Sequence, residues 1–183
     1  WKVFEGDIKY YNFTVYQGEV DVVTGGFPCQ AFSYAGKKLG LADARGTLFY
    51  EFARAVQEVQ PAICIGENVR GLLSHEKGET LKGMISILDE IGYKAVPVEV
   101  LKAIHYRVPQ KRERLILVGV RKDIDIAYKY PTPHHKIYNL RDALKKESCL
   151  IPMFLNRVVQ NTPNRKRRYW IWFRLKDTGE ICQ

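Results

Sequence analysis

A short apolar segment that runs into two glycines and a proline constrains the fold of this chain most. Asp21 to Thr24 is apolar enough to be a buried strand, and Gly25, Gly26 and Pro28 then end it. Cys29 therefore lies where a strand ends and a loop begins. In an open α/β sheet, this carboxyl edge of the strands is where ligands usually bind.

Cys29 is a candidate nucleophile because its thiol lies at that edge, after a proline that fixes the local backbone. Gln30 and Ser33 add hydrogen-bonding groups beside it. The alternative is a buried structural cysteine, since free cysteines are among the most buried residues in proteins. The polar neighbours of Cys29 and the segments that follow it favour the nucleophile.

A helix and a second strand follow, and they bring a carboxylate to the same edge. Leu48 to Val59 has apolar residues at helical spacing, Pro61 stops the helix, and Ala62 to Gly66 is a second buried strand that ends at Glu67. Such a strand–helix–strand unit makes its strands parallel and often neighbours. Cys29 and Glu67, 38 positions apart, can therefore face one pocket.

The segments after Glu67 predict a mixed sheet. After a loop from Gly71 to Gly78, the stretch Thr80 to Ile91 has the pattern of a helix that Gly92 caps. Lys94 to Leu101 alternates like a strand. Leu115 to Val120 is a core strand close enough in sequence to be antiparallel to it.

Two arginines precede that last strand. Alternation places Arg112 and Arg114 on one face, where two guanidinium groups need an anion. That anion can be a carboxylate, a phosphate or a bound base. His105, in the turn before them, is more often a turn residue than a catalyst.

Charge and composition predict a polyanionic partner. Residues 101–183 hold 19 Lys/Arg against 7 Asp/Glu, and residues 1–100 hold 10 against 13, which gives the net charge of +9. This asymmetry is typical of nucleic-acid-binding proteins, although many basic domains bind nothing specific. No apolar run approaches a membrane span, and the 4 cysteines form no C-x-x-C pair or zinc-spaced Cys/His cluster. We therefore expect no membrane, no metal and a reducing cytosol.

Three stretches, in a fixed order, carry a further signal: Pro28-Cys29-Gln30-Ala31-Phe32-Ser33 with Gly36-Lys37 and Asp43 to Leu48, then Glu67-Asn68-Val69, then Gln110-Lys111-Arg112-Glu113-Arg114. They resemble the catalytic loop and two later signatures of the DNA (cytosine-5-)-methyltransferases, in the central part of the catalytic domain of the bacterial restriction-modification type. The resemblance runs from about Gly6 to Pro133. One tripeptide alone is weak, but three in order are specific.

The resemblance implies an α/β, Rossmann-like S-adenosylmethionine-dependent methyltransferase fold with a mixed sheet. The family's first Gly-rich turn, which holds the methionine end of the cofactor, has no counterpart before Gly6, and its last two segments are missing after Gln183. We expect a fold incomplete at both ends, which alone binds S-adenosylmethionine weakly and methylates poorly. Residues 1–133 would be the catalytic domain, 134–155 a linker and 156–183 the start of a target-recognition region.

The resemblance also implies a role for each catalytic residue. Cys29 would add to carbon 6 of cytosine, so that carbon 5 can attack a methyl sulfonium. Glu67 would hydrogen-bond ring nitrogen 3 as negative charge builds there. Arg114 would bind the carbonyl of the base and Arg112 would hold Glu67 or the loop, although the assignment between the two arginines stays open.

Further residues are expected to contact the cofactor and the DNA. Asp7 would accept a hydrogen bond from the adenine amine and Ile8 would pack on the ring, and the full cofactor set is Asp7, Ile8, Pro28 and Leu48. The target base must leave the duplex to be reached. The residues that would replace it and grip phosphates are Gln30, Ser33, Lys37 and Arg45.

The expected function is methyl transfer from S-adenosylmethionine to carbon 5 of a flipped-out cytosine in a specific sequence of double-stranded DNA, in the cytoplasm of a bacterium at its nucleoid. Alternatives are the same chemistry on transfer RNA, a non-catalytic DNA-binding relative, and a cysteine hydrolase. The intact set of Cys29, Glu67, Arg112 and Arg114 disfavours a pure binder. A hydrolase would need a histidine with an evident place near Cys29.

Overall fold

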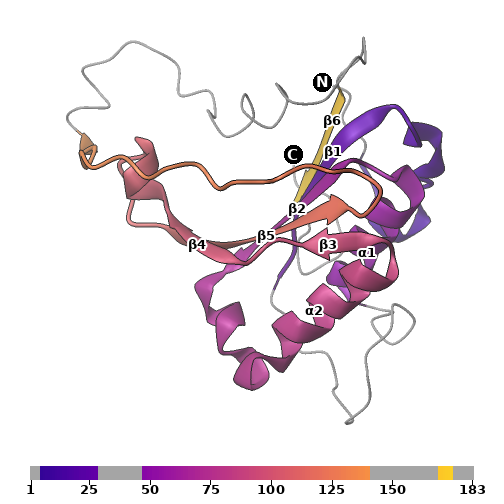
Figure 1. The fold of residues 1–183 in the computed structure, drawn as a ribbon, viewed down its shortest axis with the longest axis horizontal. Helices are drawn as coiled ribbons and strands as arrows, with labels where there is room; N and C mark the ends of the chain where they lie inside the picture. The colour runs from indigo at the N-terminus through magenta and orange to yellow at the C-terminus, as the bar shows by residue number, and fades with distance from the viewer. Residues whose placement is uncertain (1–4, 29–46, 141–168, 175–183) are drawn as a thin grey trace.

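The computed structural model describes residues 5–28 and 47–140, together with the backbone of 169–174. These residues form a 6-stranded sheet in the order β3-β5-β2-β1-β6, with β4 also paired to β5 (Figure 1). The strands are β1 Val20–Gly26, β2 Ile63–Val69, β3 Tyr93–Ala95, β4 Glu99–Lys102, β5 Glu113–Arg121 and β6 Tyr169–Arg174. The α-helices of this part of the chain are α1 Leu48–Val59 and α2 Glu79–Glu90.

The sheet is mixed, as predicted. β1 is parallel to both β2 and β6, whereas β5 is antiparallel to β2, β3 and β4. Helix α1 connects β1 to β2, so a parallel pair and its crossover stand beside an antiparallel strand. This order puts β2 at the centre, between the strand that leads to Cys29 and β5, which begins between Arg112 and Arg114.

Helix α1 has the predicted bounds, and local chemistry explains both ends. At its start, the backbone N–H of Tyr50 donates to the Thr47 hydroxyl at 3.1 Å, which is a side-chain N-cap. At its end, Gln60 adopts a left-handed backbone with φ 53° directly before Pro61, a residue that disfavours helix in the position before it. The cap and the proline leave little freedom for the helix to shift.

The single strand predicted over Lys94 to Leu101 is wrong, because the structure has two strands there. β3 ends at Ala95 and β4 begins at Glu99. Between them, the N–H of Val96 donates to Val118 at 2.9 Å, and the pairing with β5 shifts by one residue, from Ala95 opposite Gly119 to Glu99 opposite Ile116, as in a β-bulge. The predicted loop from Gly71 to Gly78 also contains short 3-10 turns, η3 Arg70–Leu73 and η4 His75–Gly78.

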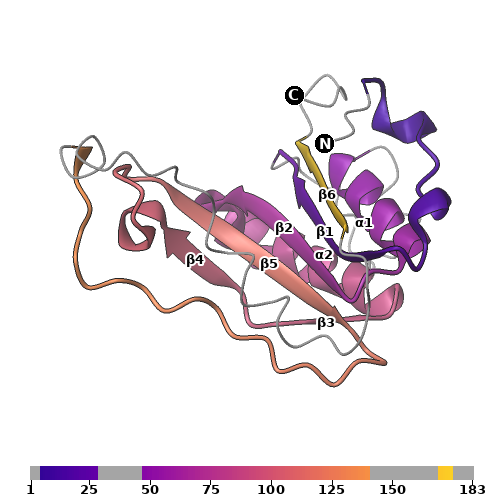
Figure 2. The same cartoon turned by 90° about the horizontal axis from the view of Figure 1, so that it is seen from above.

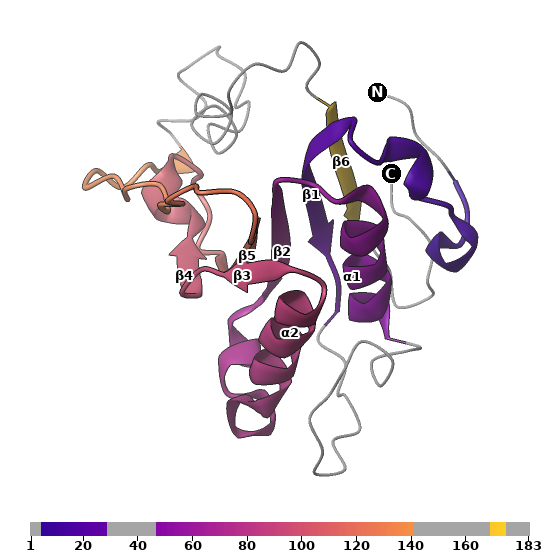
Figure 3. The ribbon, with the colours of Figure 1, turned by 45° about the vertical axis from the view of Figure 1, so that its right-hand side comes forward.

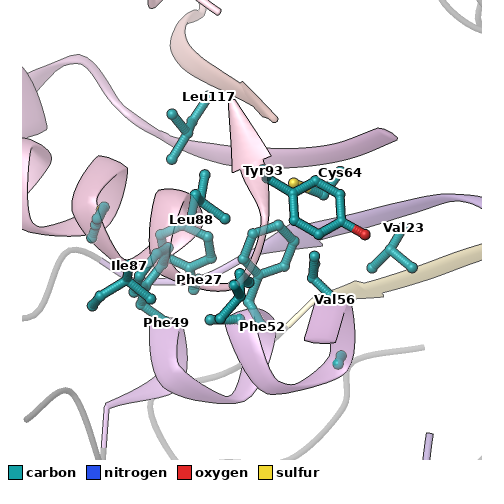
Figure 4. Close-up of a cluster of buried hydrophobic side chains, with 14 of the residues drawn as sticks. Val23, Phe27, Phe49, Phe52, Val56, Cys64, Ile87, Leu88, Tyr93 and Leu117 are labelled. Atoms are coloured by element: carbon teal, nitrogen blue, oxygen red, sulfur yellow. The ribbon is translucent and has the colours of Figure 1, made fainter. Parts of the chain in front are cut away.

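Both helices cover the same face of the sheet. Figure 3 shows α1 beside β1 and α2 beside β2 and β3, and Figure 4 shows their side chains meeting those of the strands. The core there includes Phe49 and Phe52 from α1, Leu88 from α2, and Cys64 and Leu117 from β2 and β5. No helix among the residues described is long and apolar enough to cross a membrane.

The opposite face carries a smaller core. Val22, Ile63 and Val118 are buried there, and Tyr128 and Tyr130 pack against them. The segment after β5 that carries these tyrosines runs back along the sheet, in orange in Figures 1 and 2. Because alternate residues of a strand share a face, Glu67 lies on the same face as Ile63.

A glycine in β5 is required by the packing of the larger core. A Cβ atom at Gly119 would lie 2.7 Å from Cys64 Sγ and 3.3 Å from Tyr93 Cβ. Overpacking of this kind costs about 1–3 kcal/mol, which exceeds the roughly 0.4–1 kcal/mol that Gly→Ala contributes by restricting the unfolded chain. We therefore expect Gly119→Ala to lower the free energy of unfolding by about 1–2 kcal/mol, measured by urea unfolding.

The double variant Cys64→Ala with Gly119→Ala is the control for this clash. Removing the sulfur makes room for the new methyl group, so the double variant should lose less stability than the two single losses added together. Additive losses, or an unchanged urea midpoint for Gly119→Ala, would show that the contact with Cys64 does not limit this position.

Candidate active site

β1 and β2 end side by side at one edge of the sheet. The two strands are parallel neighbours, and Gly26 of β1 is paired with Glu67 of β2. The prediction of adjacent parallel strands joined by α1 is therefore confirmed. After β1, the structure describes the chain as far as Pro28 and again from residue 47. The predicted site residues that lie between these two parts, outside the described residues, are Cys29, Gln30, Ser33, Lys37 and Arg45.

Two arginines bind the carboxylate of Glu67. Arg114 Nε lies 2.6 Å from Glu67 Oε1, and Arg112 Nη2 lies 3.4 Å from the same oxygen. Because β5 is antiparallel to β2, its start lies beside the end of β2, and both guanidinium groups approach from there. The sequence left a carboxylate, a phosphate or a bound base as the possible anion for these arginines, and in the structure it is the carboxylate of Glu67. Arg114 is the closer of the two arginines to it. The Glu67 side chain stays 39% exposed, so a ligand can reach it.

The other oxygen of Glu67 lies over β1. A Cβ atom at Gly26 would be only 3.3 Å from Glu67 Oε2, so a larger residue there would crowd the carboxylate. The absence of a side chain at Gly26 lets the carboxylate extend toward the strand that leads to Cys29. Oε1 thus faces the arginines while Oε2 lies near the end of β1. The prediction that the strand ends at Thr24 and that Gly25 and Gly26 break it is wrong, because β1 continues to Gly26. The close approach of Glu67 depends on this strand register.

Asn68 connects the end of β2 to the backbone just before Cys29. Its side chain is buried, and its Nδ2 donates to the carbonyl of Phe27 at 3.0 Å while its Oδ1 accepts from the N–H of Val69 at 2.8 Å. Phe27 is itself buried, with its ring centroid 5.1 Å from that of Phe49. A polar anchor and an aromatic anchor therefore hold the chain two residues before Cys29.

A second carboxylate at this edge also has two cationic partners. Glu113 accepts from Arg70 at 2.9 Å and from Lys102 at 3.2 Å. The hydrogen bond from Arg70, followed by that from Lys102, holds the pKa of Glu113 below its usual value. The backbone carbonyl of Glu113 accepts from Arg114 Nη1 at 2.8 Å. Sequence analysis did not predict these ion pairs, because Arg70 lies in η3, Lys102 in β4 and Glu113 in β5, far apart along the chain.

The residues expected to contact the cofactor occupy different environments. Ile8 is fully buried and Leu48 nearly so, both in the core cluster that contains Phe27. Asp7 is exposed and caps the 3-10 turn η1 Ile8–Tyr10, accepting from the N–H of Lys9 at 2.9 Å. Pro28 is half-buried. The Ile8 side chain could meet a bound ring only if the groups that cover it moved aside.

Arg54 is a residue that sequence analysis missed. It lies within hydrogen-bond distance of Glu51 and Glu58 on α1 and also of the N-terminal segment. Charges of opposite sign three and four positions apart on a helix were the available signal. That spacing usually marks an exposed helix surface, however, and it gave no indication of a partner far away in the sequence.

Comparison with known proteins agrees with the geometry. The family model for C-5 cytosine-specific DNA methylase matches residues 1–173. The chain is 57% identical over 148 residues to the Type II methyltransferase M.Eco47II of Escherichia coli, covering 80% of this chain and 36% of that protein. It is 37% identical over 173 residues to the Type II methyltransferase M.HhaI of Haemophilus parahaemolyticus, covering 89% and 52%.

A solved structure supports the fold. An Escherichia coli prophage protein assigned as a DNA modification methyltransferase superposes with a TM-score of 0.56 at 24% identity, over 76% of this chain and 40% of that one. The mixed sheet with its parallel pair and antiparallel strand is thus a Rossmann-like methyltransferase fold. The chain spans 36% of M.Eco47II and 52% of M.HhaI. From the match over residues 1–173, the chain belongs to the C-5 cytosine-specific DNA methylase family.

Proposed function

We propose that this chain carries the catalytic centre of an enzyme that transfers a methyl group from S-adenosylmethionine to carbon 5 of a cytosine in double-stranded DNA. One observation supports this most. A partly exposed carboxylate, Glu67, is bound by two arginines at the edge where the neighbouring strand leads to Cys29. The similarity to Type II methyltransferases supports the same assignment.

The side chains near η1 and α1 fit the adenosine part of this cofactor. Asp7 offers an exposed carboxylate that can accept from an amine. Pro28, two residues after β1, offers half-buried apolar surface, whereas Leu48 at the start of α1 is buried and would meet the cofactor only if the groups that cover it moved aside. When bound, S-adenosylmethionine supplies the methyl group as an electrophilic sulfonium. We assign its adenine end to Asp7, and Ile8 would pack on the adenine ring once the groups that cover Ile8 move aside.

Cys29 would supply the nucleophile. Its thiolate adds to carbon 6 of cytosine, the electron pair of the 5,6 double bond makes carbon 5 nucleophilic, and negative charge spreads to ring nitrogen 3. After carbon 5 is methylated, a base removes its proton, the double bond re-forms and the thiolate leaves. Asn68 assists by fixing the carbonyl of Phe27 before the nucleophile.

Glu67 would stabilise the charge on the base. Because Arg112 and Arg114 both approach Oε1, we assign Oε2 as the oxygen that meets ring nitrogen 3 and the amino group. Arg114 uses its Nε and Nη1 groups on Glu67 and on the Glu113 carbonyl. A guanidinium has five N–H donors, so Arg114 can also donate to the carbonyl of the base, which gives it the role of base clamp and Arg112 that of carboxylate support.

Double-stranded DNA is the proposed partner, in a bacterial cytoplasm and at the nucleoid. The excess of positive charge in residues 101–183 supports this. Flipping the cytosine out costs a few kcal/mol, which Gln30, Ser33, Lys37 and Arg45 would offset.

The proposed domain division places the catalytic domain in residues 1–133, a linker in 134–155 and the start of the target-recognition region in 156–183. Strand β6, which belongs to this last part, pairs with β1 of the catalytic domain.

The direct test is a methyl-transfer assay with the full-length protein that contains this chain. Long unmethylated genomic DNA contains every short target sequence, so incubation with methyl-labelled S-adenosylmethionine should give labelled 5-methylcytosine, identified by mass spectrometry of the digested DNA. A parallel reaction contains transfer RNA. Label in the transfer RNA alone would favour the RNA-modifying alternative, and label in neither, with S-adenosylhomocysteine still bound, would favour the non-catalytic relative.

A further inference from the structure

One guanidinium joins helix α1 to the N-terminal turn. Arg54 Nη2 donates to the carbonyl of Ile8 at 2.7 Å, and Nη1 donates to the carbonyl of Tyr11 at 3.0 Å. These carbonyls lie at the first residue of η1 and directly after its last, so a single side chain fixes both ends of the turn. Figures 2 and 3 show this N-terminal segment, in indigo, alongside α1.

The same guanidinium is held by carboxylates of its own helix. Arg54 Nε lies 2.8 Å from Glu51 Oε2, and Nη1 lies 2.8 Å from Glu58 Oε1. The second oxygen of Glu58 accepts from the N–H of Phe13 at 2.8 Å, and the guanidinium carbon lies 5.2 Å from the centre of the Phe13 ring. The N-terminal segment is therefore attached to α1 through both partners of an ion pair.

This network is largely buried. The side chains of Arg54, Glu51 and Glu58 are 17%, 7% and 24% exposed. Burial acts to lower the pKa of Arg54, but its hydrogen bonds to Glu51 and Glu58 outweigh that effect, and the pKa is raised. A charged group with this many partners inside the protein holds a fixed geometry, which an exposed ion pair does not.

We propose that Arg54 is a positioning residue for S-adenosylmethionine, because it sets where the Asp7 carboxylate stands relative to α1. Asp7 directly precedes the Ile8 carbonyl that Arg54 holds, and Leu48 begins the helix that carries Arg54. The two segments that carry these proposed cofactor contacts are thus joined by one side chain. The inference rests on the proposed function, since it takes Asp7 as a contact of the adenine.

Arg54→Lys in the full-length protein tests this inference. A lysine keeps the charge, but it lacks the planar fork that bonds to two carbonyls and two carboxylates together. We expect the Kd for S-adenosylhomocysteine to rise about tenfold, the effect of losing one charge-assisted hydrogen bond, by isothermal titration calorimetry. The KM for S-adenosylmethionine should rise with it, while kcat at saturating cofactor stays within about twofold.

Arg121→Lys is the matched control. Arg121 also links the chain to α1, because its guanidinium donates to the carbonyl of Gln60 and to Asp123, but it does so after the far end of the helix. We expect its Kd for S-adenosylhomocysteine to stay within about twofold of the parent. A purely structural role of Arg54 would lower the stability of its lysine variant and leave the KM and Kd of the folded protein unchanged.

Asp7→Ala separates failure of this inference from failure of the proposed function. If Asp7→Ala weakens S-adenosylhomocysteine binding and Arg54→Lys does not, the positioning role is wrong and the cofactor site stands. If neither variant weakens binding, the adenine contact is wrong and the inference fails with it. Should Arg54→Lys not fold, Glu58→Gln replaces it. That variant keeps an acceptor but loses the charge, and an unchanged Kd would equally overturn the proposal.

Discussion

DNA that carries 5-fluorocytosine in place of cytosine is expected to form a covalent complex with the full-length protein in the presence of S-adenosylmethionine, and Cys29→Ser is expected to abolish it. Fluorine at carbon 5 cannot leave as a proton does, so the thioether to carbon 6 persists after methylation. A serine hydroxyl is a far weaker nucleophile than a thiolate at neutral pH. We therefore expect kcat for methyl transfer to fall by about 10⁴-fold or more in Cys29→Ser.

The complex is measured as a band of reduced mobility on a denaturing gel, and peptide mass spectrometry locates the modified residue. Cys64→Ala is the matched control, because Cys64 is fully buried in the core and burial raises the pKa of its thiol to about 12. It should retain the complex. A complex that survives Cys29→Ser, or that Cys64→Ala removes from a folded protein, would mean that another group is the nucleophile.

The sequence predicted those parts of the fold that are controlled by residues close together in the chain. Helix α1 has its predicted bounds because Thr47 and Pro61, next to its two ends, control them. The strand predicted across Pro97 failed for the opposite reason. The alternation of valines there is a local pattern, but the one-residue shift in pairing around Pro97 depends on the register with β5, which a local pattern does not report.

The candidate site shows the same division. That Glu67 and the end of β1 share one edge followed from the strand–helix–strand order, and that Arg112 and Arg114 share a face followed from alternation. The ion-pair and hydrogen-bond partners of the charged side chains could not be predicted from the sequence. Arg54 reaches the carbonyl of Ile8 across 46 positions, and no spacing in the sequence connects them. Long-range contacts of this kind are set by packing, which a local pattern cannot report.

Replacing the carboxylate tests the second half of the proposed chemistry. Glu67→Gln is expected to lower kcat for methyl transfer by about 10²–10³-fold, because an amide is neutral, cannot exchange a proton with ring nitrogen 3 and no longer binds the two arginines as an anion. The loss of stability should be below about 1 kcal/mol, because the ion pair is partly exposed. Single-turnover rates with prebound DNA separate this chemical step from product release.

Glu113→Gln is the control that distinguishes a specific role of Glu67 from a general effect of negative charge at this edge. Glu113 lies at the same edge, is also a glutamate and also binds two cations, Arg70 and Lys102, so it matches Glu67 in charge and in the number of ion pairs lost. It lacks the approach to Gly26 that places Glu67 beside the strand leading to Cys29. We expect its single-turnover rate to stay within about threefold of the parent. Equal losses in the two variants would mean that Glu67 acts through the general charge of this edge, and that the carboxylate is not in contact with the base.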